Sequence, residues 1–272
     1  MLLGYNTNGL QNHRLEEALR LLADEGYEAV ALTPDVCHLD PFSATPREID
    51  SIAALLAKLS LRPVIETGAR FLLDPRHKHE PTLMTRDAAA VDRRIDFSAR
   101  AARLGRDLGA QVVSFWAGID RSPGADSEQR LLDGVRRTCA AIRAEGLTPS
   151  LEPEPGMAVA TVAQWRKVVA ALGLEAPALT LDVGHLLVED EGDPAAICRE
   201  VAPLLAQVHM EDMRRFVHEH LLPGEGDLDI GAALRGLSAG GYAGPVCFEL
   251  SRHSHMAPHA VAACKAAWAA GR

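Results

Sequence analysis

The sequence predicts an α/β protein of the (β/α)₈ TIM-barrel class, folded as a single domain over residues 1–272. Strand-like and helix-like segments alternate from one end to the other, and no Ser/Gly linker or change of composition divides them. Eight β-then-α units share 272 residues, or 34 residues each, which is close to what one βα unit needs. An open doubly wound sheet is the second interpretation, and in both folds function gathers at the carboxyl ends of the strands.

Short apolar runs followed by helical periodicity indicate the first units. Leu15, Leu19 and Leu22 form one stripe of the first helix, and Gly26 is a stop signal behind it. Pro46 is placed at the start of the second helix. The expected strands here are Leu2–Asn6, Glu28–Thr33, Leu61–Thr67 and Ala110–Trp116, with helices over His13–Gly26, from Pro46 onward and over Arg86–Leu108, and with a loop over Phe71–Leu83.

The second half keeps this rhythm. Thr161 is a candidate N-cap for a helix that runs to Leu172. The segment Arg214–Asp229 is expected to be a long loop without structure of its own, and such loops are usually functional or mobile. The expected strands end at Glu152, Asp182, His209 and Glu249, and the other helices lie near Ser127–Glu145, Pro194–Val201, Ile230–Leu237 and Pro258–Ala270.

Composition narrows the class of protein. A net charge of −9 argues against a nucleic-acid partner, which usually needs a basic footprint. Five scattered cysteines, never in a CxxC pair, indicate reduced thiols and a cytoplasmic protein. No stretch approaches 18 apolar residues and the chain begins directly with a strand-like MLLGYN, so neither a membrane span nor a signal peptide is expected.

Four strands of the second half end in a residue that can bind a metal. Glu152, Asp182, His209 and Glu249 are 30, 27 and 40 residues apart, and each interval is near one βα unit. In a barrel they would therefore stand on consecutive strands and point at one mouth. Three carboxylates and one imidazole suit a single Mn²⁺, Mg²⁺, Co²⁺ or Zn²⁺ ion with positions open for substrate.

The motifs around these residues resemble those of a known family. LEPEPG, LDVGH, VHMED followed by PGEGDLD, and GYAGPVCFEL are similar to the motifs of the xylose isomerase-like TIM barrels, which include the AP-endonuclease-type sugar isomerases and epimerases. The resemblance implies that Glu152, Asp182, His209 and Glu249 bind one divalent metal. It also implies that Glu152 and Glu249 move protons to and from a substrate carbon, by way of a metal-stabilised enediolate.

Other polar residues near strand ends are candidates for substrate contacts. The resemblance places His185 beside the substrate or on a second metal. Arg214 with His218 and His220 could clamp an anionic group. The candidate substrate-binding residues are His185, Arg214, His220, Arg252, His255, Trp116 and Asn6, and the histidine-rich loops at 76–79, 218–220 and 253–255 offer ligands for a second metal at the mouth.

The leading interpretation is an isomerase or epimerase of a small sugar, sugar phosphate or cyclitol ketone. A dehydratase acting on a keto-polyol, a multi-zinc phosphoesterase of the endonuclease branch and a barrel that only binds a metal or metabolite remain alternatives. The expected partner is a small polyhydroxy carbonyl compound. Barrels of this kind often pair, so a homodimer is compatible with the sequence.

Overall fold

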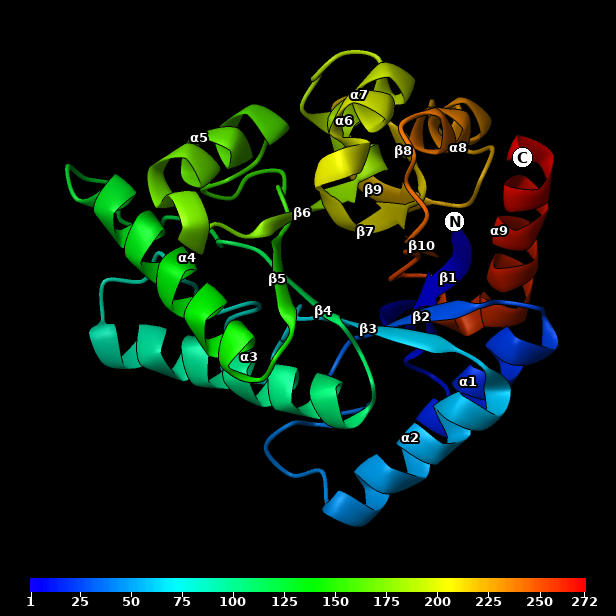
Figure 1. Cartoon of the computed structure of the whole chain (residues 1–272), viewed down its shortest axis with the longest axis horizontal. Coiled ribbons are helices and arrows are strands. Elements are labelled where there is room, and N and C mark those ends of the chain that lie inside the picture. Colours follow the sequence, from blue (N-terminus) through cyan, green and yellow to red (C-terminus); the bar gives the residue numbers. More distant parts are fainter.

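Eight short apolar segments form parallel strands that close into one barrel, and the helices lie outside it (Figure 1). The computed structural model describes all residues, 1–272. Around the barrel the strands follow the order β1-β10-β7-β6-β5-β4-β3-β2, which confirms the predicted (β/α)₈ fold. They are β1 (Leu2–Asn6), β2 (Ala29–Leu32), β3 (Arg62–Glu66), β4 (Val112–Phe115), β5 (Thr148–Leu151), β6 (Ala178–Asp182), β7 (Leu205–Met210) and β10 (Pro245–Phe248).

The helices begin and end close to the predicted positions. Thr161 caps α5 through a capping box with Gln164, as its place in the sequence indicates, and Thr45 and Glu48 form the same box on α2. No helix combines the length and apolar character needed to cross a bilayer. The helices are α1 (Leu15–Asp24), α2 (Pro46–Leu59), α3 (Ala88–Asp107), α4 (Ser127–Ala144), α5 (Val162–Leu172), α6 (Val183–Val188), α7 (Pro194–Val201), α8 (Ile230–Ala239) and α9 (Ala257–Gly271).

The core lies mainly between the strands and the surrounding helices. One cluster of 57 buried hydrophobic residues includes the inner stripes of the helices, such as Leu15, Leu19 and Leu22 of α1. A separate small cluster contains Ala31, Val64 and Cys247. Burial on both sides explains why the strands read as apolar runs without alternation.

Two short elements differ from the prediction. The segment Arg214–Asp229 is not free of structure, because β8 (Asp212–Arg214) and β9 (Val217–Leu221) pair as an antiparallel hairpin. Helix α6 starts directly after β6, where the side chain of Asp182 accepts a hydrogen bond from the His185 N–H. Elements of three to six residues carry too little periodicity to stand out in a sequence.

Candidate active site

The residues that end the barrel strands form one polar layer at the mouth. Side chains alternate between the two faces of a strand, so the residue two positions earlier also faces the barrel interior. On β1 and β10 these deeper positions hold the small residues Gly4 and Cys247. A Cβ added to Gly4 would lie 2.5 Å from the Sγ of Cys247. The polar layer above comprises Asn6, Thr33, Glu66, Trp116, Glu152, Asp182, His209 and Glu249.

The structure brings together the four residues expected to bind a metal. One ligand atom from each of Glu152, Asp182, His209 and Glu249 lies within 4.8 Å of the others. The Nδ1 of His209 is 2.9 Å from Glu152 Oε1 and 3.1 Å from Glu249 Oε2. Asp182 Oδ2 is buried and has no hydrogen-bond partner. Such a concentration of buried carboxylates, with one oxygen unpaired, fits the donor set of a divalent cation.

The side chain of Gln207 contacts the imidazole of His209 on the side away from the carboxylates. Its Nε2 lies 2.5 Å from the side-chain amide of Gln207, which stands two residues earlier on β7. The amide nitrogen of Gln207 faces the ring and its oxygen has no partner. With the amide turned, that oxygen would accept a hydrogen bond from the Nε2–H and leave Nδ1 as the nitrogen that can bind a metal. Burial lowers the pKa of His209, but the charges of Glu152 and Glu249 outweigh burial, and the pKa lies well above its ordinary value.

Two asparagines hold Glu249. The side-chain amide of Asn8 donates to Glu249 Oε1 at 2.8 Å, and that of Asn6 donates to Oε2 at 3.3 Å. Asn8 lines the cavity at the barrel mouth, whereas Asn6, predicted to contact substrate, is buried and does not line it. These bonds fix the carboxylate of Glu249 from the β1 side.

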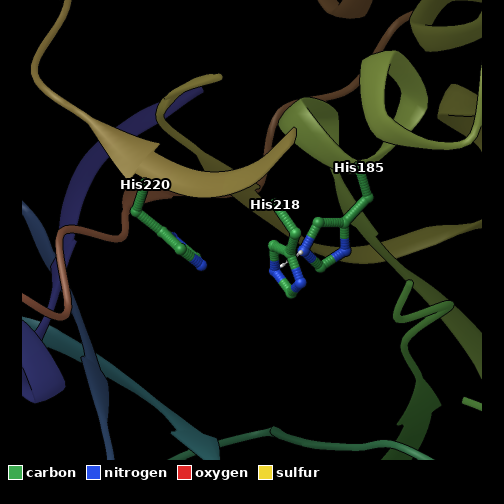
Figure 2. Close-up of side chains that lie close together, drawn as sticks. All are labelled: His185, His218 and His220. Atoms are coloured by element: carbon green, nitrogen blue, oxygen red, sulfur yellow. Dashed lines mark hydrogen bonds between the residues drawn. The ribbon is translucent and has the colours of Figure 1, made fainter. Parts of the chain in front are cut away.

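Three histidines form a second group beside the first (Figure 2). His185 comes from α6, while His218 and His220 lie two residues apart on β9 and therefore on one face of the hairpin. The Nδ1 atoms of His185 and His220 lie 3.1 and 2.9 Å from the carbonyls of Pro153 and Glu249. An Nδ1–H that donates to a carbonyl leaves Nε2 as the free ring nitrogen. The Nε2 atoms of His185 and His218 are 3.2 Å apart.

Neighbouring charges shift the pKa values of His185 and His218 in opposite directions. Burial lowers the pKa of His185, but Asp182 and Glu154 raise it to about 9. Burial and the charges of His185 and His220 lower the pKa of His218 to about 4. A proton between the two facing Nε2 atoms therefore resides on His185, at a position that a metal cation could also occupy.

A cavity of about 220 Å³ opens above both groups. It is lined by four of the predicted substrate contacts, which are Trp116, His185, His220 and Arg252. Arg214 and His255 do not line it: both side chains are exposed, and Arg214 reaches the Glu225 carbonyl instead. The hairpin explains the first of these differences, since Arg214 precedes the turn and the histidines follow it.

Three acids of the site were not predicted as site residues. Glu66 ends β3 in the same way that Asp182 ends β6, so the pattern RPVIE carried the signal. Burial raises the pKa of Glu66 to about 7, with a further contribution from Glu249. Glu154 lines the cavity, and burial raises its pKa to about 8. Burial and the charge of Asp182 raise the pKa of Glu211 well above its ordinary range.

Asp212 organises the segment behind the hairpin. Its carboxylate accepts hydrogen bonds from the backbone N–H groups of Gly224, Gly226 and Leu228 at 2.8 to 3.0 Å. A Cβ at Gly226 would lie 2.3 Å from Asp212 Oδ1, so glycine is needed for this approach. The glycines of PGEGDLD therefore wrap the Asp212 side chain.

Comparison with known proteins places this geometry in context. The family model of the xylose isomerase-like TIM barrel matches residues 19–270. An L-ribulose 3-epimerase of Mesorhizobium japonicum is 26% identical over 245 residues, covering 86% of this chain and 75% of that protein. A D-tagatose 3-epimerase-like protein superposes with a TM-score of 0.81 at 17% identity, covering 100% and 97% of the two chains. The zinc-containing IolI protein superposes with a TM-score of 0.79 at 18% identity, covering 100% and 98%.

Proposed function

The chain belongs to the xylose isomerase-like TIM barrel family, and from this premise we propose that it is a metal-dependent isomerase or epimerase of a small polyhydroxy carbonyl compound. One observation carries the proposal, namely the convergence of Glu152, Asp182, His209 and Glu249 at one mouth of the closed barrel. Two glutamates in one cluster supply an acid and a base for moving a proton at carbon.

Glu152, Asp182, His209 and Glu249 are the residues that would hold the metal ion. Bound to them, a divalent ion would polarise a substrate carbonyl and make the neighbouring C–H more acidic. The donor set is rich in oxygen and contains no cysteine, which suits Mn²⁺, Mg²⁺ or Co²⁺ and is compatible with Zn²⁺.

Proton movement is assigned to Glu152 and Glu249. One carboxylate removes the proton next to the carbonyl, and the other returns a proton to the same or the adjacent carbon. Return to the same carbon from the opposite face inverts it, whereas return to the adjacent carbon interconverts ketose and aldose. Asn8 and Asn6 keep the carboxylate of Glu249 oriented through both reactions. Acid–base catalysis of this kind typically contributes about 10²–10⁴-fold.

The relatives support this reaction class. The similar protein from Mesorhizobium japonicum is an L-ribulose 3-epimerase, and epimerisation beside a ketone carbonyl requires removal and return of one proton. A dehydratase would begin with the same proton removal, so it stays the second candidate within the same site.

Deuterium exchange tests the proposal. Ketoses and inososes are incubated with the metal-loaded protein in D₂O and followed by NMR. We expect uptake at the carbon next to the carbonyl, and we expect Glu152→Gln and Glu249→Gln to slow it by about 10²–10⁴-fold. Glu225→Gln, an exposed acid outside the cavity, serves as the matched control. Uptake at the wild-type rate in both site variants would refute the assigned proton transfers.

The histidine group supports a second metal ion at the mouth. His185, His218 and His220 offer three imidazole nitrogens within 4.8 Å of one another, and two of the rings are oriented by backbone carbonyls, as metal-binding histidines usually are. Two ions in adjacent groups are also the arrangement that a metal-dependent phosphoesterase needs. Counting the metal ions bound per chain therefore distinguishes a protein with two metal sites from one with a single metal site.

A further inference from the structure

Three basic side chains gather at the mouth of an otherwise acidic site. Arg70 and Lys78 follow β3, Arg252 follows β10, and all three line the same cavity as the metal-binding group. The chain as a whole carries a net charge of −9. The cluster of cations at the cavity is therefore a local feature of the site, since the chain as a whole is acidic.

The charges of these three side chains are not neutralised by close salt bridges within the protein. Neither Arg70 nor Lys78 forms a salt bridge, and the nearest carboxylate of Arg252 is Glu219 at 3.7 Å. Elsewhere, surface arginines pair closely with acids, as Arg86 does with Asp126 at 2.7 Å. Burial lowers the pKa of Lys78, the charges of Arg70 and Arg252 lower it further, and Glu154, which lines the same cavity, raises it. All three groups line one cavity of about 220 Å³, and an anion bound between them would reduce their mutual repulsion.

The cavity joins buried carboxylates at the strand ends to cations on the loops that follow β3 and β10. Its floor holds the carboxylates of Glu152, Asp182 and Glu249, where a metal and a carbonyl group would bind, and its rim holds the three cations. A substrate that fills such a cavity would carry its negative group at the end away from its carbonyl. Guanidinium groups bind phosphate and carboxylate through paired hydrogen bonds, and a lysine adds a point charge.

We propose that the substrate is a polyhydroxy carbonyl compound with a terminal phosphate or carboxylate, and that Arg70, Lys78 and Arg252 bind this anionic group. The inference rests on the proposed function for the carbonyl end of the substrate. It replaces Arg214, expected from the sequence to clamp an anion, with cations that line the cavity. Two of the three similar proteins described above are named for neutral ketoses, so an anionic substrate would differ from the sugars in those names.

Binding of unreactive polyols tests the rim without catalysis. Glucitol 6-phosphate, gluconate and glucitol are titrated into the metal-loaded protein by calorimetry, because none of them has a carbonyl group to react. We expect at least one anionic polyol to bind tenfold or more tightly than glucitol, and the tighter of the two identifies the group. We expect Lys78→Met and Arg252→Gln each to weaken that binding at least tenfold. Arg76→Gln, in the same loop but outside the cavity, should bind as the wild type does.

The outcomes separate the two proposals. Equal binding of glucitol and both anions, or anion binding unaffected by Lys78→Met and Arg252→Gln, overturns the anionic substrate. In the exchange assay, neutral ketoses that exchange as fast as ketose phosphates and keto acids overturn it as well, while leaving the proposed reaction in place. Rim-dependent anion binding without exchange in any carbonyl compound overturns only the proposed reaction.

Discussion

At the scale of single side chains, the site depends on residues that orient its acids. Glu249 is tied to Asn8 and Asn6, and His209 contacts both Glu152 and Glu249 through one nitrogen. Carboxylates placed this closely repel one another unless donors and cations hold them. The neutral amides of Asn6 at the end of β1 and Asn8 just after it therefore decide where the Glu249 carboxylate lies, although neither amide titrates.

Replacement of Asn8 tests this positioning role. Asn8→Leu removes the 2.8 Å hydrogen bond to Glu249 Oε1 and keeps a similar volume. Loss of such a supporting hydrogen bond typically lowers metal affinity or activity by about 10- to 100-fold. We expect a fall of that size in metal affinity measured by calorimetry and in deuterium exchange. The control is Asn12→Leu, an exposed asparagine near the same strand end, and wild-type values for Asn8→Leu would show that the bond does not position Glu249.

At the scale of elements, the β8–β9 hairpin places two of the three clustered histidines. The hairpin and the chain behind it depend on one buried side chain, because Asp212 accepts three backbone hydrogen bonds from the following loop. Without this acceptor the three N–H groups would lose their partner. For the buried Leu228 N–H the loss costs about 1–3 kcal/mol, whereas the bonds from Gly224 and Gly226 are only partly buried and cost less.

Hydrogen exchange of the hairpin measures this dependence. In Asp212→Ala, we expect faster amide exchange at Gly224, Gly226 and Leu228 and at β9, with the barrel strands remaining protected. Asp227→Ala removes only one such bond, that from the Arg215 N–H, and should give a smaller effect confined to its neighbours. Equal protection of the loop in Asp212→Ala and the wild type would contradict the proposed organising role.

At the scale of the whole molecule, barrel closure converts separate strand ends into one site. The strand pairs β6–β7 and β7–β10 set Asp182 beside His209, and His209 beside Cys247, two residues before Glu249. A metal bound to Glu152, Asp182, His209 and Glu249 would link the ends of four neighbouring strands, and it would bind only the folded state.

Metal removal therefore changes stability as well as activity. A ligand at 100 times its dissociation constant stabilises by about 2.7 kcal/mol, which for a domain of this size corresponds to a fall in Tm of roughly 5–10 °C on chelation. We expect that fall in the wild type and a smaller one in Asp182→Asn, which keeps only the histidine group as a metal site. Elemental analysis should find two ions per chain in the wild type and one in His218→Ala. A single ion in both proteins would refute the second metal, and an unchanged Tm would refute the first.

Much of this protein could be predicted from local sequence. Apolar runs, caps and spacing indicate the barrel, and they predict that the four strand-ending candidate ligands lie together, because every parallel strand of a barrel ends at the same mouth. Glu66 carried the same signal on β3 and was missed because only the second half resembled a known family.

What only the tertiary structure decided concerns contacts across loops. Short hairpin strands turn the chain at residues 214–217, so Arg214 leaves the cavity while His218 and His220 enter it. The approach of Arg70, Lys78 and Arg252 depends on two loops more than 170 residues apart in sequence. Periodicity reports which face of an element is buried, and thus the order and direction of the strands. Distances between side chains on separate loops depend on packing between those loops, which no local pattern encodes.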